Sequence, residues 1–147
     1  MKITSNFIAI VVTTVFVLLS TAWAQEQVMH SGKATFISGG VGETSAERLA
    51  ALAPEFNLKL LFAAKDGHYL SEVLVKIDDA RNTKVLETVA EGPFLFARLT
   101  PGNYQVTAIY GDISVKRSTT VSATGRRDLV FRWEERADLA RDYFTPP

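Results

Sequence analysis

The chain has 147 residues, of which 16 are basic and 16 acidic, so its formal net charge is zero. This length allows one hydrophobic core. A neutral chain without a basic run longer than two residues lacks the electrostatic signature of a nucleic-acid-binding protein. Cysteine is absent, which excludes disulfide bonds, a thiolate nucleophile and lipid attachment to cysteine. We therefore expect a domain that its core alone stabilises and that has no nucleic-acid partner.

The first 24 residues have the three parts of a secretory signal. Lys2 precedes an apolar stretch at Phe7–Leu19, and Ala22-Trp23-Ala24 places small residues at the −3 and −1 positions of a cleavage site. A retained membrane anchor is the alternative, but Phe7–Leu19 is shorter than the roughly 20 residues that span a bilayer. We expect cleavage after Ala24, no stable membrane insertion afterwards, and a location in the bacterial periplasm or outside the cell.

Residues 25–56 are expected to form a flexible lead-in, a glycine-rich turn and one short helix. Gln25–Lys33 is polar and has no periodic pattern, as is typical of a mobile terminal segment. Ala34–Ser38 is suited to a short strand, and Gly39-Gly40-Val41-Gly42 then predicts a turn.

The helix is expected to begin with a capping box. Thr44 precedes Glu47 by three residues, and in such a box the two side chains pair with backbone N–H groups that the first turn leaves unbonded. Pro54 disfavours helical geometry at Ala53, so the helix should end there after about two turns. So short a helix must be held by packing residues such as Leu49 on the rest of the domain.

From Leu58 onwards the pattern changes from helical to β. Apolar and polar residues alternate in short segments, which turn sequences such as Asp66-Gly67 and Gly111-Asp112 separate. Seven strands at this regular spacing are typical of an all-β, Greek-key-like sandwich. The expected domain therefore covers residues 57–133, and residues 134–147 form a polar C-terminal tail.

Most aromatic residues of these strands are expected in the core, because a sandwich of this size needs several large apolar side chains between its sheets. They are Phe94, Phe96, Tyr104, Tyr110, Phe131 and Trp133. A carbohydrate-binding platform is the alternative for this set. Tyr69, Leu95 and Tyr143 are the better candidates for exposure.

One segment, Leu99-Thr100-Pro101-Gly102-Asn103-Tyr104-Gln105-Val106, is the most characteristic of the chain. Together with Asp66-Gly67, Val73-Leu74-Val75 and Gly92-Pro93-Phe94, it resembles the carboxypeptidase regulatory-like domain, a member of the transthyretin (prealbumin)-like β-sandwich group. The resemblance covers about half of the chain and implies a transthyretin-like or immunoglobulin-like sandwich. It implies no particular activity, because such domains occur as appendages, adhesin modules and transport-protein extensions.

Within this segment, Pro101 and Gly102 are expected to form a turn, and Tyr104 follows directly. A tyrosine just after a sharp turn can bury its ring and return its hydroxyl to nearby backbone, as in the tyrosine corner of sandwiches. We therefore assign Pro101, Gly102 and Tyr104 a structural role.

Few residues are suited to catalysis or metal binding. His30 lies in the lead-in and His68 in a hairpin turn, so the sequence does not place them together around a metal or beside a nucleophile. Hydroxyisourate hydrolases of the transthyretin-like group use several histidines and end in Tyr-Arg-Gly-Ser, whereas this chain ends in Thr145-Pro146-Pro147. We expect no enzymatic activity, no catalytic or metal-binding residues and no cofactor.

The glycine loop before the helix is the one candidate site. Glycines at a helix start can expose N–H groups to an anion, but Glu43 would repel an anion there. The loop also lacks the Lys-Ser/Thr ending of a phosphate-binding loop. A tight turn is the first interpretation, and a contact loop for a partner or ligand is the second. Its candidate residues are Gly39, Gly40, Gly42, Glu43, Thr44 and Arg48.

These observations predict an exported, non-catalytic module that binds an unidentified protein or envelope component through loops or an exposed edge strand. The alternative is a small-ligand carrier or sensor that uses Gly39–Thr44, with Glu43 and Arg48 as polar contacts. Because the edge strands of a sandwich can pair between two copies, the sequence also allows a homodimer.

Overall fold

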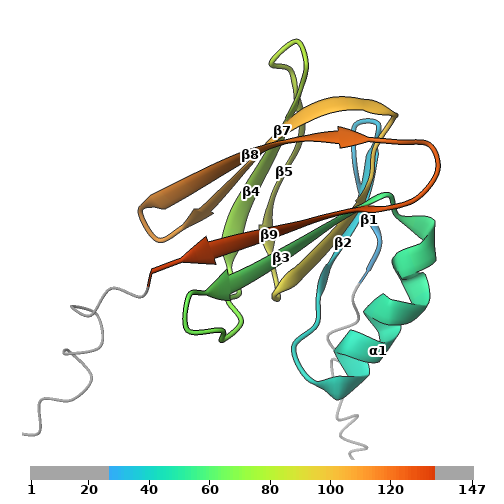
Figure 1. Ribbon diagram of the computed structural model, residues 1–147. Helices are drawn as coiled ribbons and strands as arrows, with labels where there is room; N and C mark the ends of the chain where they lie inside the picture. Colours follow the sequence, from blue (N-terminus) through green and yellow to red (C-terminus); the bar gives the residue numbers. More distant parts are fainter. Residues whose placement is uncertain (1–26, 135–147) are drawn as a thin grey trace, which may run out of the picture.

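Figure 1 shows the computed structural model, which describes residues 27–134. The expected signal peptide at residues 1–24 lies outside this range, as does the expected polar tail apart from Glu134. The described chain forms two β-sheets, with nine strands in all, and one short α-helix. The expected all-β, sandwich-like fold is therefore confirmed, but with nine strands rather than seven. None of the helical segments in residues 27–134 combines the length and apolar character of a membrane-spanning helix.

The larger sheet, called sheet A, has five strands in the spatial order β1-β2-β6-β3-β9. These strands are β1 (Met29–Ser31), β2 (Ala34–Gly39), β6 (Phe94–Arg98), β3 (Leu58–Ala64) and β9 (Arg127–Trp133). Neighbouring strands are antiparallel except β3 and β9, which run parallel. The last strand of the described chain therefore forms one edge of this sheet.

The smaller sheet, sheet B, has four antiparallel strands in the order β5-β4-β7-β8. They are β5 (Lys84–Ala90), β4 (Val73–Asp79), β7 (Gly102–Tyr110) and β8 (Ile113–Val121). Strands β7 and β8 form a long hairpin around Gly111-Asp112, where Gly111 has a φ of 60°. A positive φ at the first central residue suits the twist of a two-residue hairpin, and glycine adopts it without strain.

The two additional strands precede the helix: β1 lies in the expected lead-in, and β2 matches the short strand expected at Ala34–Ser38. Met29–Ser31, expected to be flexible, pairs with the start of β2, and β2 pairs with β6 over five positions. Strand β2 is buried on both faces, since Phe36 lies in the main core and Ile37 in a second cluster. Its apolar residues therefore do not alternate with polar ones, and its sequence lacks the period-2 signal.

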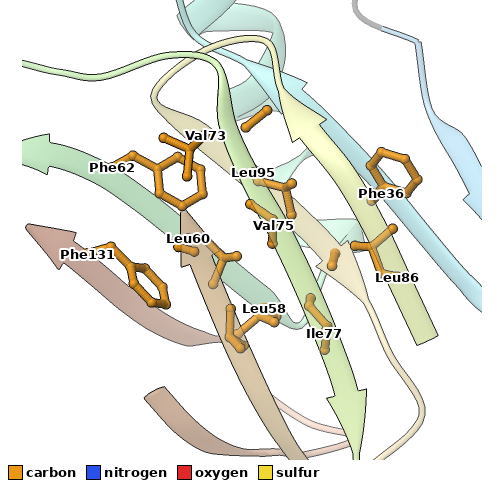
Figure 2. Close-up of a cluster of buried hydrophobic side chains, with 14 of the residues drawn as sticks. Phe36, Leu58, Leu60, Phe62, Val73, Val75, Ile77, Leu86, Leu95 and Phe131 are labelled. Atoms are coloured by element: carbon orange, nitrogen blue, oxygen red, sulfur yellow. The ribbon is translucent and has the colours of Figure 1, made fainter. Parts of the chain in front are cut away.

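The main core lies between the inner faces of the two sheets, as Figure 2 shows. Leu58, Leu60 and Phe62 of β3 face Val73 and Val75 of β4, and none of these side chains is exposed to solvent. Their spacing follows the period of two that puts alternate side chains of a strand on one face. Burying each such side chain contributes about 1.5–3 kcal/mol to folding.

A second apolar cluster joins helix α1 (Glu43–Leu52) and the 3₁₀ turn η1 (Ala53–Glu55) to the outer face of sheet A. It contains Ile37, Leu49, Ala53, Phe56 and Phe96. In Figure 1, α1 lies beside β2. The helix has ten residues and only Leu49 is fully buried, so packing on the sheet holds it in place.

Strand β6 differs from its prediction because it is also buried on both faces. Leu95, expected to be exposed, is fully buried in the main core. Phe96, expected in the main core, lies in the cluster under α1, and Phe94 packs against that cluster while half-buried. When both faces of a strand are apolar, alternation alone does not tell which face meets which layer. Tyr110, also expected in the core, is 39% exposed.

The turn before β6 comes very close to the end of β2. A Cβ atom on Gly92 would lie 2.2 Å from the carbonyl oxygen of Gly39, so a larger residue at Gly92 would force the two backbones apart. At Gly102, by contrast, a Cβ atom would make only ordinary contacts, the nearest at 3.8 Å. These two glycines therefore have different structural roles.

We predict that Gly92→Ala lowers the free energy of unfolding by about 1–3 kcal/mol, because the added methyl group overpacks a site that backbone atoms fill. Gly102→Ala, the matched control, should change it by less than about 0.5 kcal/mol. Urea unfolding of both variants beside the wild type measures the difference. Equal effects of the two substitutions would contradict the close approach.

Candidate functional site

The glycine loop, Gly39–Gly42, is tightly packed where it contacts Phe94 of sheet A and Leu49 of α1. Gly40 has a φ of 94°, and a Cβ atom there would lie 2.4 Å from the ring of Phe94. Its N–H group donates a hydrogen bond to the Ser45 hydroxyl at 2.7 Å. Gly39, at the end of β2, is buried as well. The loop therefore depends on its glycines to pass between the sheet and the helix.

The expected capping box is wrong. Helix α1 begins at Glu43 with Gly42 at the N-cap position, and no side chain caps it. Thr44 lies inside the first turn, whereas a capping box needs the hydroxyl residue before the helix. The first turn holds Glu43 instead, whose charge suits the positive end of the helix. Of the candidate residues, Gly42, Glu43, Thr44 and Arg48 are exposed.

We predict that Ser45→Ala lowers the free energy of unfolding by about 1 kcal/mol, because the N–H group of Gly40 loses its acceptor. Thr44→Ala should leave it unchanged or raise it slightly, because alanine has the higher helix propensity. Thermal unfolding of the two single variants provides the measurement. A loss of stability in Thr44→Ala alone would restore the capping-box interpretation.

The second group of candidate residues surrounds the turn between β6 and β7. Tyr104 is 9% exposed and its hydroxyl donates a hydrogen bond to the carbonyl oxygen of Thr100 at 2.5 Å. Pro101 is exposed in this turn and Gly102 begins β7. Burial raises the pKa of Tyr104 above its ordinary value, and the nearby Asp79 carboxylate adds to the rise. The neutral hydroxyl is thus part of the folded corner.

We predict that Tyr104→Phe lowers the free energy of unfolding by about 1 kcal/mol near neutral pH, since the hydrogen bond to Thr100 is lost. The pKa of the tyrosine is raised in the folded state, so its contribution is complete below the unfolded value of about 10 and is lost as pH rises further. The stability difference between wild type and variant should shrink above that pH. Urea titrations at neutral and alkaline pH test this, and a constant difference would contradict it.

The two histidines lie apart, each with its own partner. The Nδ1 atom of His30 is 3.2 Å from the Thr35 hydroxyl. The backbone N–H of His68 donates a hydrogen bond to the Asp66 carboxylate, and the His68 ring makes a second one. Both hydrogen bonds hold the pKa of that carboxyl below its ordinary value, the backbone one most strongly. Within residues 27–134, no three His, Cys, Asp or Glu side chains are placed to hold a metal ion.

The outer face of sheet A carries a row of exposed and half-buried apolar side chains, of which the sequence prediction named only Tyr69 as exposed. The register places Phe94 of β6 beside Leu61 of β3, and Leu61 beside Val130 of β9. Tyr69 packs on Phe94 with ring centroids 5.6 Å apart. We call Leu61, Tyr69, Phe94 and Val130 the apolar row. Tyr69 is 61% and Val130 36% exposed, so the row is open to solvent beyond the part of the face that α1 covers.

Basic side chains flank the apolar row. The Lys59 ammonium lies 5.1 Å from the centroid of the Phe94 ring, and Arg126 lies 5.7 Å from that of Phe96. Arg126 also pairs with Asp128 at 2.9 Å. At the other end, the register puts the exposed Arg132 beside Ala63. The surface therefore combines an apolar centre with a basic rim.

A cavity of about 360 Å³ lies between α1 and this face of the sheet. Its lining includes Leu49, Ala53, Lys59, Phe94, Phe96 and Arg126. The two cations lie over the aromatic floor, which is the arrangement of a cation–π contact. This cavity adjoins the helix but is lined by different residues from those of the Gly39–Thr44 loop.

A comparison of the sequence with protein-family models and with curated proteins finds no match. The candidate surfaces are therefore defined by geometry. Sequence reasoning named Tyr69 as exposed, which was the one available sign of the apolar row. The exposure of Phe94 was not predicted, because Phe94 was assigned to the core face of β6 and Leu95 to the exposed face, and the structure shows the reverse.

Proposed function

We propose that this chain is an exported, non-catalytic β-sandwich module that binds a protein or another component of the cell envelope, in the periplasm or outside the cell. The exposed apolar row on sheet A carries this proposal. Contiguous apolar side chains with a polar rim are typical of interaction sites on soluble domains. The secretory pattern of residues 1–24 supports export.

We also propose that the sandwich has Greek-key connections and belongs with the carboxypeptidase regulatory-like domains of the transthyretin-like group. The turn at Pro101 joins β6 of one sheet to β7 of the other, as a sandwich connection of this type does. The hydrogen bond from Tyr104 to Thr100 has the form of a tyrosine corner. Such domains serve many proteins as accessory units, so the fold supports a binding role without naming the partner.

The apolar row suits a partner with its own apolar side chains and with acidic neighbours. Lys59 at one end and Arg132 at the other would pair with carboxylates at the rim of the contact. Tyr69 and Phe94 supply large, rigid contact area at the centre, which is where binding energy concentrates in protein interfaces. The rim charges would act mainly on the rate and the specificity of association.

A small-ligand carrier or sensor is the second candidate function. The cavity beside α1 favours it more than the Gly39–Thr44 loop does, because the cavity combines a concave apolar floor with the Lys59 and Arg126 cations. A ligand with a flat apolar ring and an anionic group fits this chemistry. Glu43 and Arg48 remain exposed on the helix as additional polar contacts.

We predict that Val130→Lys reduces capture of a defined partner from the cell envelope by about tenfold or more, because a charge replaces an apolar side chain of the contact. Val89→Lys is the matched control, since Val89 is an exposed strand valine of sheet B and the substitution adds the same charge. Crosslinked pull-downs with wild type and both variants provide the measurement.

Equal capture by wild type and Val130→Lys would contradict the use of the apolar row. If the wild type captures nothing, a panel of aromatic carboxylates in a thermal-shift assay tests the second candidate function. A ligand of the native state raises the melting temperature, and Lys59→Gln should abolish that rise.

A further inference from the structure

Strand β8 offers an unpaired edge over most of its length. It is the last strand of sheet B, and β7 is its neighbour on the other side. Tyr110 and Ile113 face each other across the two-residue turn, so this pair exchanges both backbone hydrogen bonds. Along the hairpin, hydrogen-bonded pairs then alternate with pairs that exchange no hydrogen bond. The β8 residues of the non-hydrogen-bonded pairs direct their backbone N–H and C=O groups away from β7, to the free edge. They are Ser114, Lys116, Ser118 and Thr120. Their side chains are all exposed.

The side of the sandwich at β8 and β9 is basic. Lys116 and Arg117 lie on β8, and Arg127 and Arg132 lie on β9. No ion pair within residues 27–134 engages any of these four side chains. At one end, a hydrogen bond joins the edges of the two sheets: the Trp133 indole N–H donates to the Ile113 carbonyl oxygen at 3.1 Å. The remaining edge is thus open and positively charged.

Arg117 occupies a position on the inner face of β8. It pairs in register with Val106, which lies in the main core. Its guanidinium carbon lies 5.8 Å from the centroid of the Phe131 ring on β9. An inward-pointing charge on an edge strand disfavours pairing with a second copy of the same strand, because like charges would meet. The edge is therefore better suited to a different, acidic chain than to a homodimer.

Thr119 provides an independent sign of a ligand group at this edge. It is 9% exposed, and its buried hydroxyl has no hydrogen-bond partner within the described residues. It lines a cavity of about 520 Å³ together with Tyr104, Arg127 and Leu129. Asp79 also lines this cavity, but one of its carboxylate oxygens accepts hydrogen bonds from the N–H groups of Arg81 and Thr83. Buried hydroxyls normally take part in a hydrogen bond, so the Thr119 hydroxyl is available to a hydrogen-bonding group of another molecule.

We propose that the free edge of β8 binds an extended acidic segment of a partner protein by strand addition. The added strand pairs with the backbone of Ser114–Thr120, and the side chains opposite Arg117 and Thr119 point to the inner face. A carboxylate there accepts a hydrogen bond from the Thr119 hydroxyl and pairs with the guanidinium groups of Arg117 and Arg127. This edge is separate from the apolar row on the outer face of sheet A, so the two proposals can fail independently.

The test uses a heptapeptide in which glutamate alternates with threonine, titrated into the exported chain. Binding should slow the hydrogen exchange of the amides of Ser114, Lys116, Ser118 and Thr120. Arg117→Glu should weaken binding by about tenfold or more, and Thr119→Val should weaken it by up to about tenfold, since hydrogen bonds to charged groups are lost. Lys84→Glu is the matched control: it changes the net charge equally on β5, the opposite edge strand of sheet B, and binding should stay within about twofold.

Two control peptides make the outcome decisive. A peptide with lysine in place of glutamate, and one with N-methyl groups on alternate amides, should both bind at least about tenfold more weakly. Equal binding of the lysine peptide would overturn the acidic partner, and exchange protection outside Ser114–Thr120 would overturn strand addition. Absence of peptide binding would also overturn the proposal. So would a dimer of the chain alone that remains intact in the Thr119→Val and Arg117→Glu variants.

Discussion

The burial of strand β6 on both faces is the constraint on which the rest of the structure depends. Leu95 and Ala97 close the main core, while Phe96 supports helix α1 on the other side. A strand buried in this way needs cover from two layers: sheet B packs on one face of β6 and α1 on the other, while β2 pairs along its edge within sheet A. The backbone contact at Gly92 follows from the same arrangement, because the turn into β6 passes directly over the end of β2.

This cover is incomplete, and the incompleteness creates the candidate site. Helix α1 is only ten residues long and packs on the side of sheet A that β2 and β6 form. The apolar side chains of β3 and β9 on the same face, Leu61 and Val130, are left with partial exposure. A helix twice as long could cover them. The row is thus a consequence of the lengths of the elements, and the cations at its ends give this apolar surface a charged rim.

Local patterns in the sequence were sufficient for the strands after Leu58 and for the hairpin at Gly111, because alternation and turn chemistry act over a few residues. They also indicated a short strand at Ala34–Ser38, but not its pairing with β6, which lies far along the chain. The face of Phe94 could not be predicted for the same reason: both faces of β6 are apolar, and the layer that covers each one is a tertiary property. The prediction of Thr44 as the N-cap was wrong because the helix begins two residues earlier than expected, with Gly42 at the N-cap position.

Net charge was the least informative property of the sequence for choosing a partner. The chain is formally neutral, yet Lys116, Arg117, Arg127 and Arg132 gather on the side formed by β8 and β9. Sheet order produces this gathering, since it brings the last two strands to neighbouring edges of different sheets. A neutral total excludes a uniformly charged surface, but it places no limit on the charge of one side of a sandwich. Electrostatic fields are screened within about 8 Å at physiological salt, so each side acts largely on its own. Partner chemistry therefore has to be argued from each edge and face separately.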